Sequence, residues 1–359
     1  MSTRLAPDPA AARGEHANNI DALRLVLAGL VVVCHCYKIA RGSSLAAEPL
    51  ARLSDGRIDL GEAAVDGFFI LSGYLIAQSW ERSRSLGSFA RKRAARIVPG
   101  YLAAGVVAVL AAVLVGTPGG SWADAGHALR ANAGRLLALQ EPVVPGSWPA
   151  PPEAGVANGS AWTISYECWC YAGVATLGVL GLLRRRGLVL GLFVAAWVGG
   201  YLFILGGYPI GGGLVGRVVG APIHWARLLP CYLAGVVLAL YRDRVRWSGA
   251  GASLAALGLG AVALLPRGLA LGVPTFGAYL LLYFGLAGPI RWRGAARYGD
   301  FSYGIYLYAW PIQQAAARLD PTAGPLRLLA WVAGPILLAG VLSWYGVERW
   351  FVRRRPERA

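Results

Sequence analysis

Two polar side chains, Arg24 and His35, lie inside the first long apolar stretch of the chain, residues 20–40. A charged or titratable side chain is costly in a membrane span, so each is a candidate functional residue. The residues are eleven positions apart, which on an α-helix is close to three turns, so both share one face about 16 Å apart along the axis. A cation near the inner water boundary and an imidazole deep in the span favour an elongated anionic ligand that reaches a proton-transfer group.

Carboxylates and hydroxyls enter two further apolar segments. Asp66 lies near the outer end of the second segment and suits a partner for a cation or a sugar hydroxyl, whereas Ser72 serves either a ligand or close helix packing. Glu167 lies in the outer half of the fourth segment, two positions after Ser165. Its carboxylate either orients an imidazole or holds an acceptor hydroxyl, or it only pairs with a buried arginine.

Arg93 and Arg96 form a basic pair in the loop that enters the third segment. Residues three apart are neighbours on a helix surface, so the two guanidinium groups could bind one phosphate together. The alternative is that both arginines only fix the orientation of the chain in the membrane.

The sequence Cys34-His35-Cys36 has metal-binding residue types without the geometry of a metal site. Helix neighbours two apart point about 200° away from each other, so the two thiols cannot both bind an ion held by His35. We interpret the five cysteines as apolar filler and predict neither a metal site nor a disulfide framework.

The composition places these residues in an all-α, polytopic membrane protein. Of its 359 residues, 56% are hydrophobic and 14% charged, with a mean hydropathy of +0.51, whereas soluble chains have about a quarter of their residues charged. A bilayer span needs about 20 apolar residues, and we predict about ten transmembrane helices. They cover residues 20–40, 62–80, 97–115, 161–183, 188–206, 226–241, 249–265, 269–288, 301–317 and 326–345.

Arginine clusters alternate along the chain with connections that carry few basic residues. Ten spans put every cluster and both termini on one side, which the positive-inside rule makes the cytoplasm. The net charge of +16 then needs no nucleic-acid partner. We expect a polar cytoplasmic leader over residues 1–19, without a cleavable signal, a transmembrane domain over 20–347 and a basic cytoplasmic tail over 348–359, with no internal repeat.

The longest connection, residues 116–160, falls on the outer side. Residues 123–139 are predicted to form a short interfacial helix. Trp122, Trp148 and His127 favour a membrane-interface belt, with sugar stacking as the alternative.

The segments that contain these residues together resemble the acyltransferase-3 family, the integral membrane O-acyltransferases. The matching pieces run in order through almost the whole chain, and comprise residues 19–24 leading to His35, then 66–74, 93–99, 158–167 and 301–311. The resemblance implies a ten-helix core that transfers an acyl group, usually acetyl, from cytoplasmic acyl-CoA to a hydroxyl of a carbohydrate or related acceptor.

The resemblance also assigns roles to individual residues. The family's Arg-to-His, paired-arginine and Ser-x-Glu motifs map onto Arg24 and His35, Arg93 and Arg96, and Ser165 and Glu167. We therefore expect His35 and Glu167 to be catalytic and the three arginines to bind acyl-CoA, a co-substrate and not a permanently bound cofactor. The residues expected to bind substrate are Asp66, Ser72, Ser165, Trp162 and Tyr303.

Ala309 departs from the family pattern, because many members have histidine there and this chain has no second base at that position. We expect a multi-pass protein of the bacterial inner (plasma) membrane, with no hydrolase-like domain after the last span. A polysaccharide or a glycosylated small molecule fits as acceptor. The main alternative is a non-catalytic transporter or flippase, since proton-coupled carriers also place Arg, His and Glu in the membrane; a membrane scaffold is a third.

Overall fold

The structure, a computed structural model, describes residues 19–40, 45–148, 155–207, 216, 218–290, 292, 294–295 and 297–352. Regular structure in these ranges is helical, apart from one isolated β-bridge between Val143 and Val156. The all-α class is therefore confirmed. Residues 1–18 of the predicted leader and 353–359 of the predicted tail lie outside the described residues.

A helix lies in each range predicted as a membrane span. These helices are α1 (Ile20–Ala40), α3 (Leu60–Glu81), α4 (Leu86–Ala111), α6 (Trp162–Val179), α7 (Arg186–Leu205), α9 (Pro222–Leu240), α10 (Gly249–Ala263), α11 (Leu269–Gly272) continued by α12 (Ala278–Leu286), α13 (Ser302–Leu319) and α14 (Pro325–Ser343). Shorter elements are η1 (Leu45–Ala47), α2 (Pro49–Leu53), α5 (Trp122–Leu137), η3 (Leu182–Arg184) and α15 (Arg349–Val352), with π-helical turns η2 (Ala112–Gly116), η4 (Val273–Gly277) and η5 (Trp344–Glu348).

Within the described ranges, seven helical segments are long and apolar enough to cross a membrane. They are residues 20–40, 60–81, 86–116, 186–205, 222–240, 269–286 and 325–352. The helix α10 is shorter, and α6 and α13 carry several polar side chains of the candidate site. The chain is a multi-pass membrane protein on this basis.

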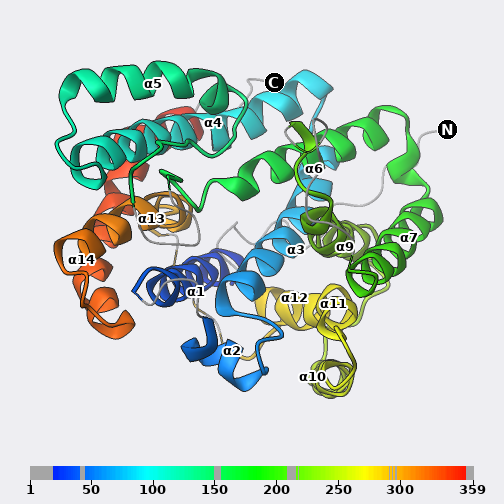
Figure 1. The fold of residues 1–359 in the computed structure, drawn as a ribbon. Helices are drawn as coiled ribbons and strands as arrows, with labels where there is room; N and C mark the ends of the chain where they lie inside the picture. The colour runs from blue at the N-terminus through cyan, green and yellow to red at the C-terminus, as the bar shows by residue number, and fades with distance from the viewer. Residues whose placement is uncertain are drawn as a thin grey trace.

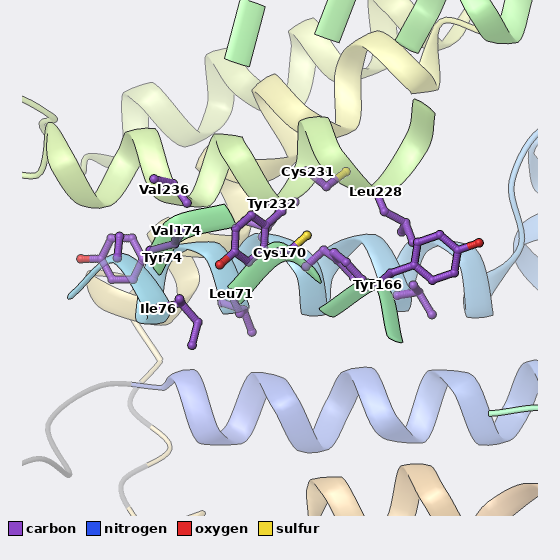
Figure 2. Packing of buried hydrophobic residues seen from close by; sticks show 14 of the residues in the cluster. Leu71, Tyr74, Ile76, Tyr166, Cys170, Val174, Leu228, Cys231, Tyr232 and Val236 are labelled. Atoms are coloured by element: carbon purple, nitrogen blue, oxygen red, sulfur yellow. The ribbon is translucent and has the colours of Figure 1, made fainter. Parts of the chain in front are cut away.

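The helix α3 is central, packed between α1 and α9 and also against α6 and α12 (Figure 1). Lipid gives little hydrophobic driving force between helices, so close packing at small residues has to hold them. A side chain at Gly73 would meet the backbone of Tyr232, and one at Gly235 would meet the backbone of Ile70. Figure 2 shows the resulting interface, with Leu71 and Tyr74 of α3 beside Tyr232 of α9.

The N-terminal end of α3 is fixed by a capping box. The Asp59 carboxylate accepts from the Glu62 backbone N–H at 2.7 Å, and the Glu62 carboxylate accepts from the Asp59 N–H. These contacts satisfy backbone donors that a helix start leaves unpaired. They set the depth at which Glu62 and Asp66 enter the bundle.

The connection between α4 and α6 contains the predicted short helix, α5, which lies along α4 (Figure 1). The interface-belt interpretation is wrong for Trp148, which is only 1% exposed and belongs to a buried cluster that includes Val109 and Val113. Trp122 is 71% exposed, so it keeps an outward-facing position. Because Trp148 is buried, its ring can neither lie at the membrane interface nor stack on a sugar.

Candidate functional site

Two cavities lie one after the other along α1, α3, α6 and α13. We name them by the orientation predicted from the sequence. The inner cavity has a volume of about 120 Å³ and is lined by Arg24, and the outer cavity has a volume of about 500 Å³ and is lined by His35. Val65 and Tyr306 line both cavities. The two residues that share one face of α1 therefore open into neighbouring spaces with a common wall.

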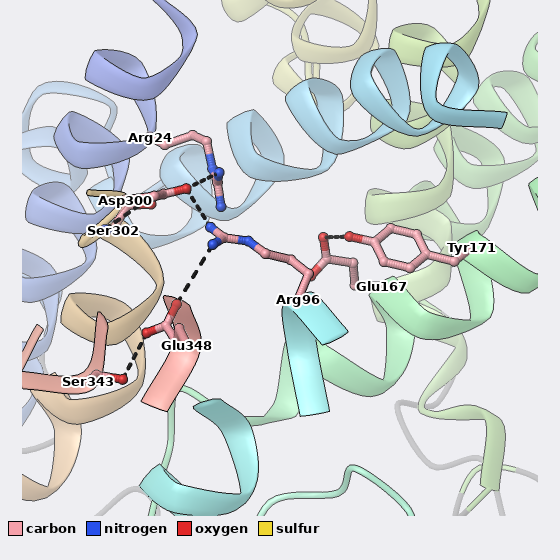
Figure 3. Close-up of polar contacts among 8 residues, drawn as sticks. All are labelled: Arg24, Arg96, Glu167, Tyr171, Asp300, Ser302, Ser343 and Glu348. Atoms are coloured by element: carbon pink, nitrogen blue, oxygen red, sulfur yellow. Dashed lines mark hydrogen bonds and ion pairs between the residues drawn. The ribbon is translucent and has the colours of Figure 1, made fainter. Parts of the chain in front are cut away.

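The inner cavity brings Arg24, Arg93 and Arg96 together, as the sequence predicted. Two of the three already have a carboxylate partner, however. Arg24 and Arg96 both donate to Asp300, and Arg96 also lies 3.7 Å from Glu348 (Figure 3). The sequence predicted that Arg93 and Arg96 could bind one phosphate together. In the structure the Arg96 guanidinium is paired with Asp300 and Glu348 and is not free.

Asp300 holds this cluster together and was missed by sequence reasoning. Burial raises the pKa of its carboxyl, but Arg24 and Arg96 outweigh this and hold the pKa below its usual range. The Ser302 hydroxyl adds a hydrogen bond of 2.5 Å. The signal that could have found Asp300 is its place directly before the segment 301–311.

Arg93 differs from the other two arginines. No hydrogen bond or ion pair joins it to another described residue, and its buried Nε has no partner. Its side chain lines the inner cavity near Glu167 and Tyr171. Because buried polar groups are normally satisfied, Arg93 is the cation of this cavity that is left to bind an anion.

Glu167 also lies in the inner cavity, and this corrects its expected place beside the imidazole. Its carboxylate accepts from the Ser72 hydroxyl at 3.0 Å and from the Tyr171 hydroxyl. Among the residues that the structure describes, it makes no contact with His35. The reason is its position along α6: it lies more than one turn inward from Trp162, so it faces Ser72 of α3.

Tyr303 lines the same inner cavity and contacts Arg96. The Arg96 guanidinium lies 5.7 Å from the centre of the Tyr303 ring, and the Tyr303 hydroxyl donates to the Ile97 carbonyl at 2.9 Å. Ser72 and Tyr303 are thus placed on the side of the arginines and not on the side of His35.

His35 lies in the wall of the outer cavity and is 8% exposed. Its ring meets Trp310 edge-on, with centroids 4.9 Å apart. Nδ1 is buried, and no described residue gives it a hydrogen bond. Nε2 is consequently the nitrogen left to meet a molecule in the cavity.

A network of three charged side chains adjoins this cavity, and two of them, Glu62 and Arg227, line it. Asp66 Oδ1 lies 3.1 Å from Arg227 Nε, and Arg227 Nη1 donates to Glu62 at 2.7 Å. The prediction that Asp66 has a cationic partner is confirmed. The partner, Arg227, was missed, although a cation inside the predicted span 226–241 was a signal of the same kind as Arg24.

Aromatic side chains also line the outer cavity. The Trp162 and His224 rings are 4.4 Å apart and tilted by 40°, and Tyr166 lies edge-on to Trp162 at 5.6 Å. Ser165 lines the cavity as well, with its hydroxyl donating to the Trp162 carbonyl at 3.2 Å. The outer cavity therefore combines flat aromatic surface with polar groups, as sugar-binding sites do.

The neighbouring thiols of α1 point in different directions, as the helix geometry predicted. Cys34 lies 3.4 Å from the Asp59 carboxylate, whereas Cys36 accepts from Gln313 at 3.0 Å. In the described part of the chain, no group of three or more His, Cys, Asp or Glu side chains is placed to hold a metal ion.

The helices α1, α3, α6 and α13 thus surround two neighbouring cavities that share Val65 and Tyr306 as lining residues. The acyltransferase-3 family, described as an acyltransferase domain, matches residues 17–345. The chain belongs to this family, which decides between the acyltransferase and the transporter in favour of the acyltransferase. It is similar to an O-acetyl transferase of Shigella phage Sf6, with 27% identity over 346 residues that cover 94% of this chain and 97% of the phage protein. No solved structure is significantly similar to it.

Proposed function

We propose that the chain is an O-acetyltransferase that moves an acetyl group from cytoplasmic acyl-CoA to a hydroxyl of a carbohydrate or a glycosylated small molecule. The observation that carries this proposal is the junction of the two cavities at Val65 and Tyr306. An unpartnered cation, Arg93, lies on one side of the junction and an imidazole, His35, on the other. The name of the phage relative supports acetyl as the group transferred.

The donor enters from the inner side in this proposal. The CoA diphosphate binds Arg93, and the slender pantetheine arm passes the wall formed by Val65 and Tyr306. The axial gap from Arg24 to His35, about 16 Å for eleven helical positions, is similar to the length of that arm. The thioester then lies in the outer cavity beside His35, while Ser72 and Tyr303 contact the arm.

The acceptor binds in the outer cavity, where Trp162 and Ser165 contact it. His35 Nε2 takes the proton of the acceptor hydroxyl as the hydroxyl oxygen attacks the thioester carbonyl carbon. The carbon–sulfur bond breaks, and the CoA thiolate takes the proton back from the imidazolium. Lys38, a cation that lines the same cavity, supplies positive potential for the oxyanion between these steps.

Topology supports this division of roles. With the ten spans and cytoplasmic termini predicted from the sequence, the inner cavity lies on the side of the arginine-rich loops. Acyl-CoA is available there, and the wide outer cavity faces a glycan outside the plasma membrane.

Labelled acetyl-CoA incubated with the purified protein and envelope glycans tests the proposal. We expect label to appear as an acetyl ester on the glycan, and mass spectrometry to show the corresponding acetyl-sized difference in cells with and without the gene. Binding of acetyl-CoA without any acylated product, across a panel of envelope glycans and glycosides, would contradict it.

A further inference from the structure

A third cavity, of about 700 Å³, lies at the inner ends of α3 and α6 and the start of α4. Its lining is basic and polar, with Arg84, Arg184 and Arg186 against a single lining carboxylate, Glu81. We call it the basic cleft. It shares no lining residue with the inner cavity, and the sequence explained its arginines only as charge that orients the chain.

The basic cleft continues the line of the two cavities toward the cytoplasm. On α4, Leu86 of the cleft lies seven positions before Arg93 of the inner cavity, and on α6, Gly178 lies seven positions after Tyr171. Seven positions are about 10 Å along a helix. On these two helices the cleft lining therefore begins about 10 Å beyond the inner cavity, and on α3 it begins at the next residue, with Ala77 following Ile76.

The charges of the basic cleft are only partly compensated. Glu81 pairs with Arg242 at 2.8 Å, and Arg186 pairs with Asp243 at 2.8 Å. The exposed side chain of Arg184 has no ion pair or hydrogen bond to any described residue. The start of α4, a helix of 26 residues, adds the positive end of its dipole. The cleft thus has a positive potential and a free guanidinium.

The wall of the cleft also has an aromatic side chain. Trp80 lines it, held against Gly178 of α6 and edge-on to Phe89, with ring centroids 5.2 Å apart. A rigid indole beside arginines suits a ligand with both a flat base and phosphates.

We propose that the basic cleft binds the 3′-phosphoadenosine part of the CoA thioester, an assignment that rests on the function proposed above. With the diphosphate at Arg93, the nucleoside extends about 10 Å toward the cytoplasm and reaches the cleft. The 3′-phosphate dianion pairs with Arg184, whose planar guanidinium matches phosphate oxygens. This also gives the donor phosphates a second basic site, since Asp300 already binds Arg24 and Arg96.

Donor kinetics with two thioesters test the assignment. We expect Arg184→Glu to raise the KM for acetyl-CoA about ten-fold or more, with kcat unchanged and little effect on acetyl-3′-dephospho-CoA. Arg184→Lys should recover part of the loss. The matched control is Arg185→Glu, which changes the neighbouring charge outside the cleft lining. Equal effects on both donors, or an equal effect of Arg185→Glu, would overturn the assignment.

A binding measurement separates this assignment from the proposed function. Adenosine 3′,5′-bisphosphate should bind the full-length protein in phosphatidylcholine nanodiscs, and Arg184→Glu should weaken it about ten-fold. Binding without acetyl transfer by the wild type would leave the cleft assigned and reject the enzyme. Transfer from acetyl-CoA without bisphosphate binding would reject the cleft alone. An Arg184 effect seen only with phosphatidylglycerol would assign the cleft to a lipid head group and overturn the proposal.

Discussion

The inner and outer cavities differ in how far their polar side chains are paired with other residues of the fold. In the inner cavity, Asp300 joins Arg24 and Arg96, so one carboxylate connects α1, α4 and the start of α13. In the outer cavity, His35 has no polar partner among the described residues and meets only the edge of Trp310. Satisfied ion pairs fix helices in place, whereas an imidazole without a polar partner in a cavity wall is available to a ligand, as we propose for His35.

We expect the largest effect from His35→Ala, which tests whether the imidazole in the outer cavity serves catalysis and not the fold. Acetyl transfer should fall about 10³-fold, within the range of lost general-base catalysis. The thermal unfolding midpoint should change little, because no hydrogen bond is lost. Both quantities are measured on one detergent-purified preparation. More than a tenth of wild-type transfer in a folded His35→Ala protein would contradict the role of His35.

Asp300→Asn tests whether the ion pairs of the inner cavity stabilise the fold. It leaves Arg24 without a carboxylate and Arg96 with only the more distant Glu348, which costs about 3 kcal/mol of unfolding free energy. The control is Asp243→Asn, whose exposed ion pair with Arg186 is worth less than about 1 kcal/mol. Chemical denaturation compares the two, and equal losses would show that Asp300 does not hold the helices together.

The same carboxylate predicts a direction for acid destabilisation. Because its folded-state pKa lies below the usual value, Asp300 stabilises the fold fully above the unfolded-state pKa of about 4. This contribution is lost as the pH falls from there through the lowered pKa. The wild type should lose stability over this acid range, and Asp300→Asn should lose less; identical pH dependence would contradict the assignment.

Arg93→Gln tests whether Arg93, unlike Arg24 and Arg96, binds the donor and does not stabilise the fold. Since Arg93 has no carboxylate partner, its loss should leave unfolding unchanged but raise the KM for acetyl-CoA about ten-fold. Lys92→Gln, at the exposed neighbouring position, should change neither quantity. A loss of stability in Arg93→Gln with an unchanged KM would assign Arg93 to the fold instead.

Glu167→Gln should have the smallest effect, a few-fold loss of transfer, because glutamine still accepts from Ser72 and Tyr171. The acidic limb of the pH–rate profile, which reports His35, should not move. A shift of that limb by about one pH unit would show that Glu167 does act on the imidazole.

The helices were predictable because hydropathy and capping are local properties of the sequence. The joint lining of one cavity by Arg24, Arg93 and Arg96 followed from topology. Their partner did not, because Asp300 lies 276 positions from Arg24, and its contact depends on how α13 packs on α1. Likewise, the cavity that Glu167 enters depends on how α6 is rotated against α3. The resemblance to the family did not predict that rotation.

The most direct test of the two-cavity account is the sidedness of the donor. Labelled acetyl-CoA, which does not cross the bilayer, is added to sealed membrane vesicles from cells that carry the acceptor. We expect acetylated glycan when acetyl-CoA reaches the cytoplasmic face of the membrane. This is the case when it is added to inside-out vesicles or enclosed within right-side-out vesicles. Equal labelling of intact right-side-out vesicles by external acetyl-CoA would contradict a thioester arm that reaches His35 from the arginine side.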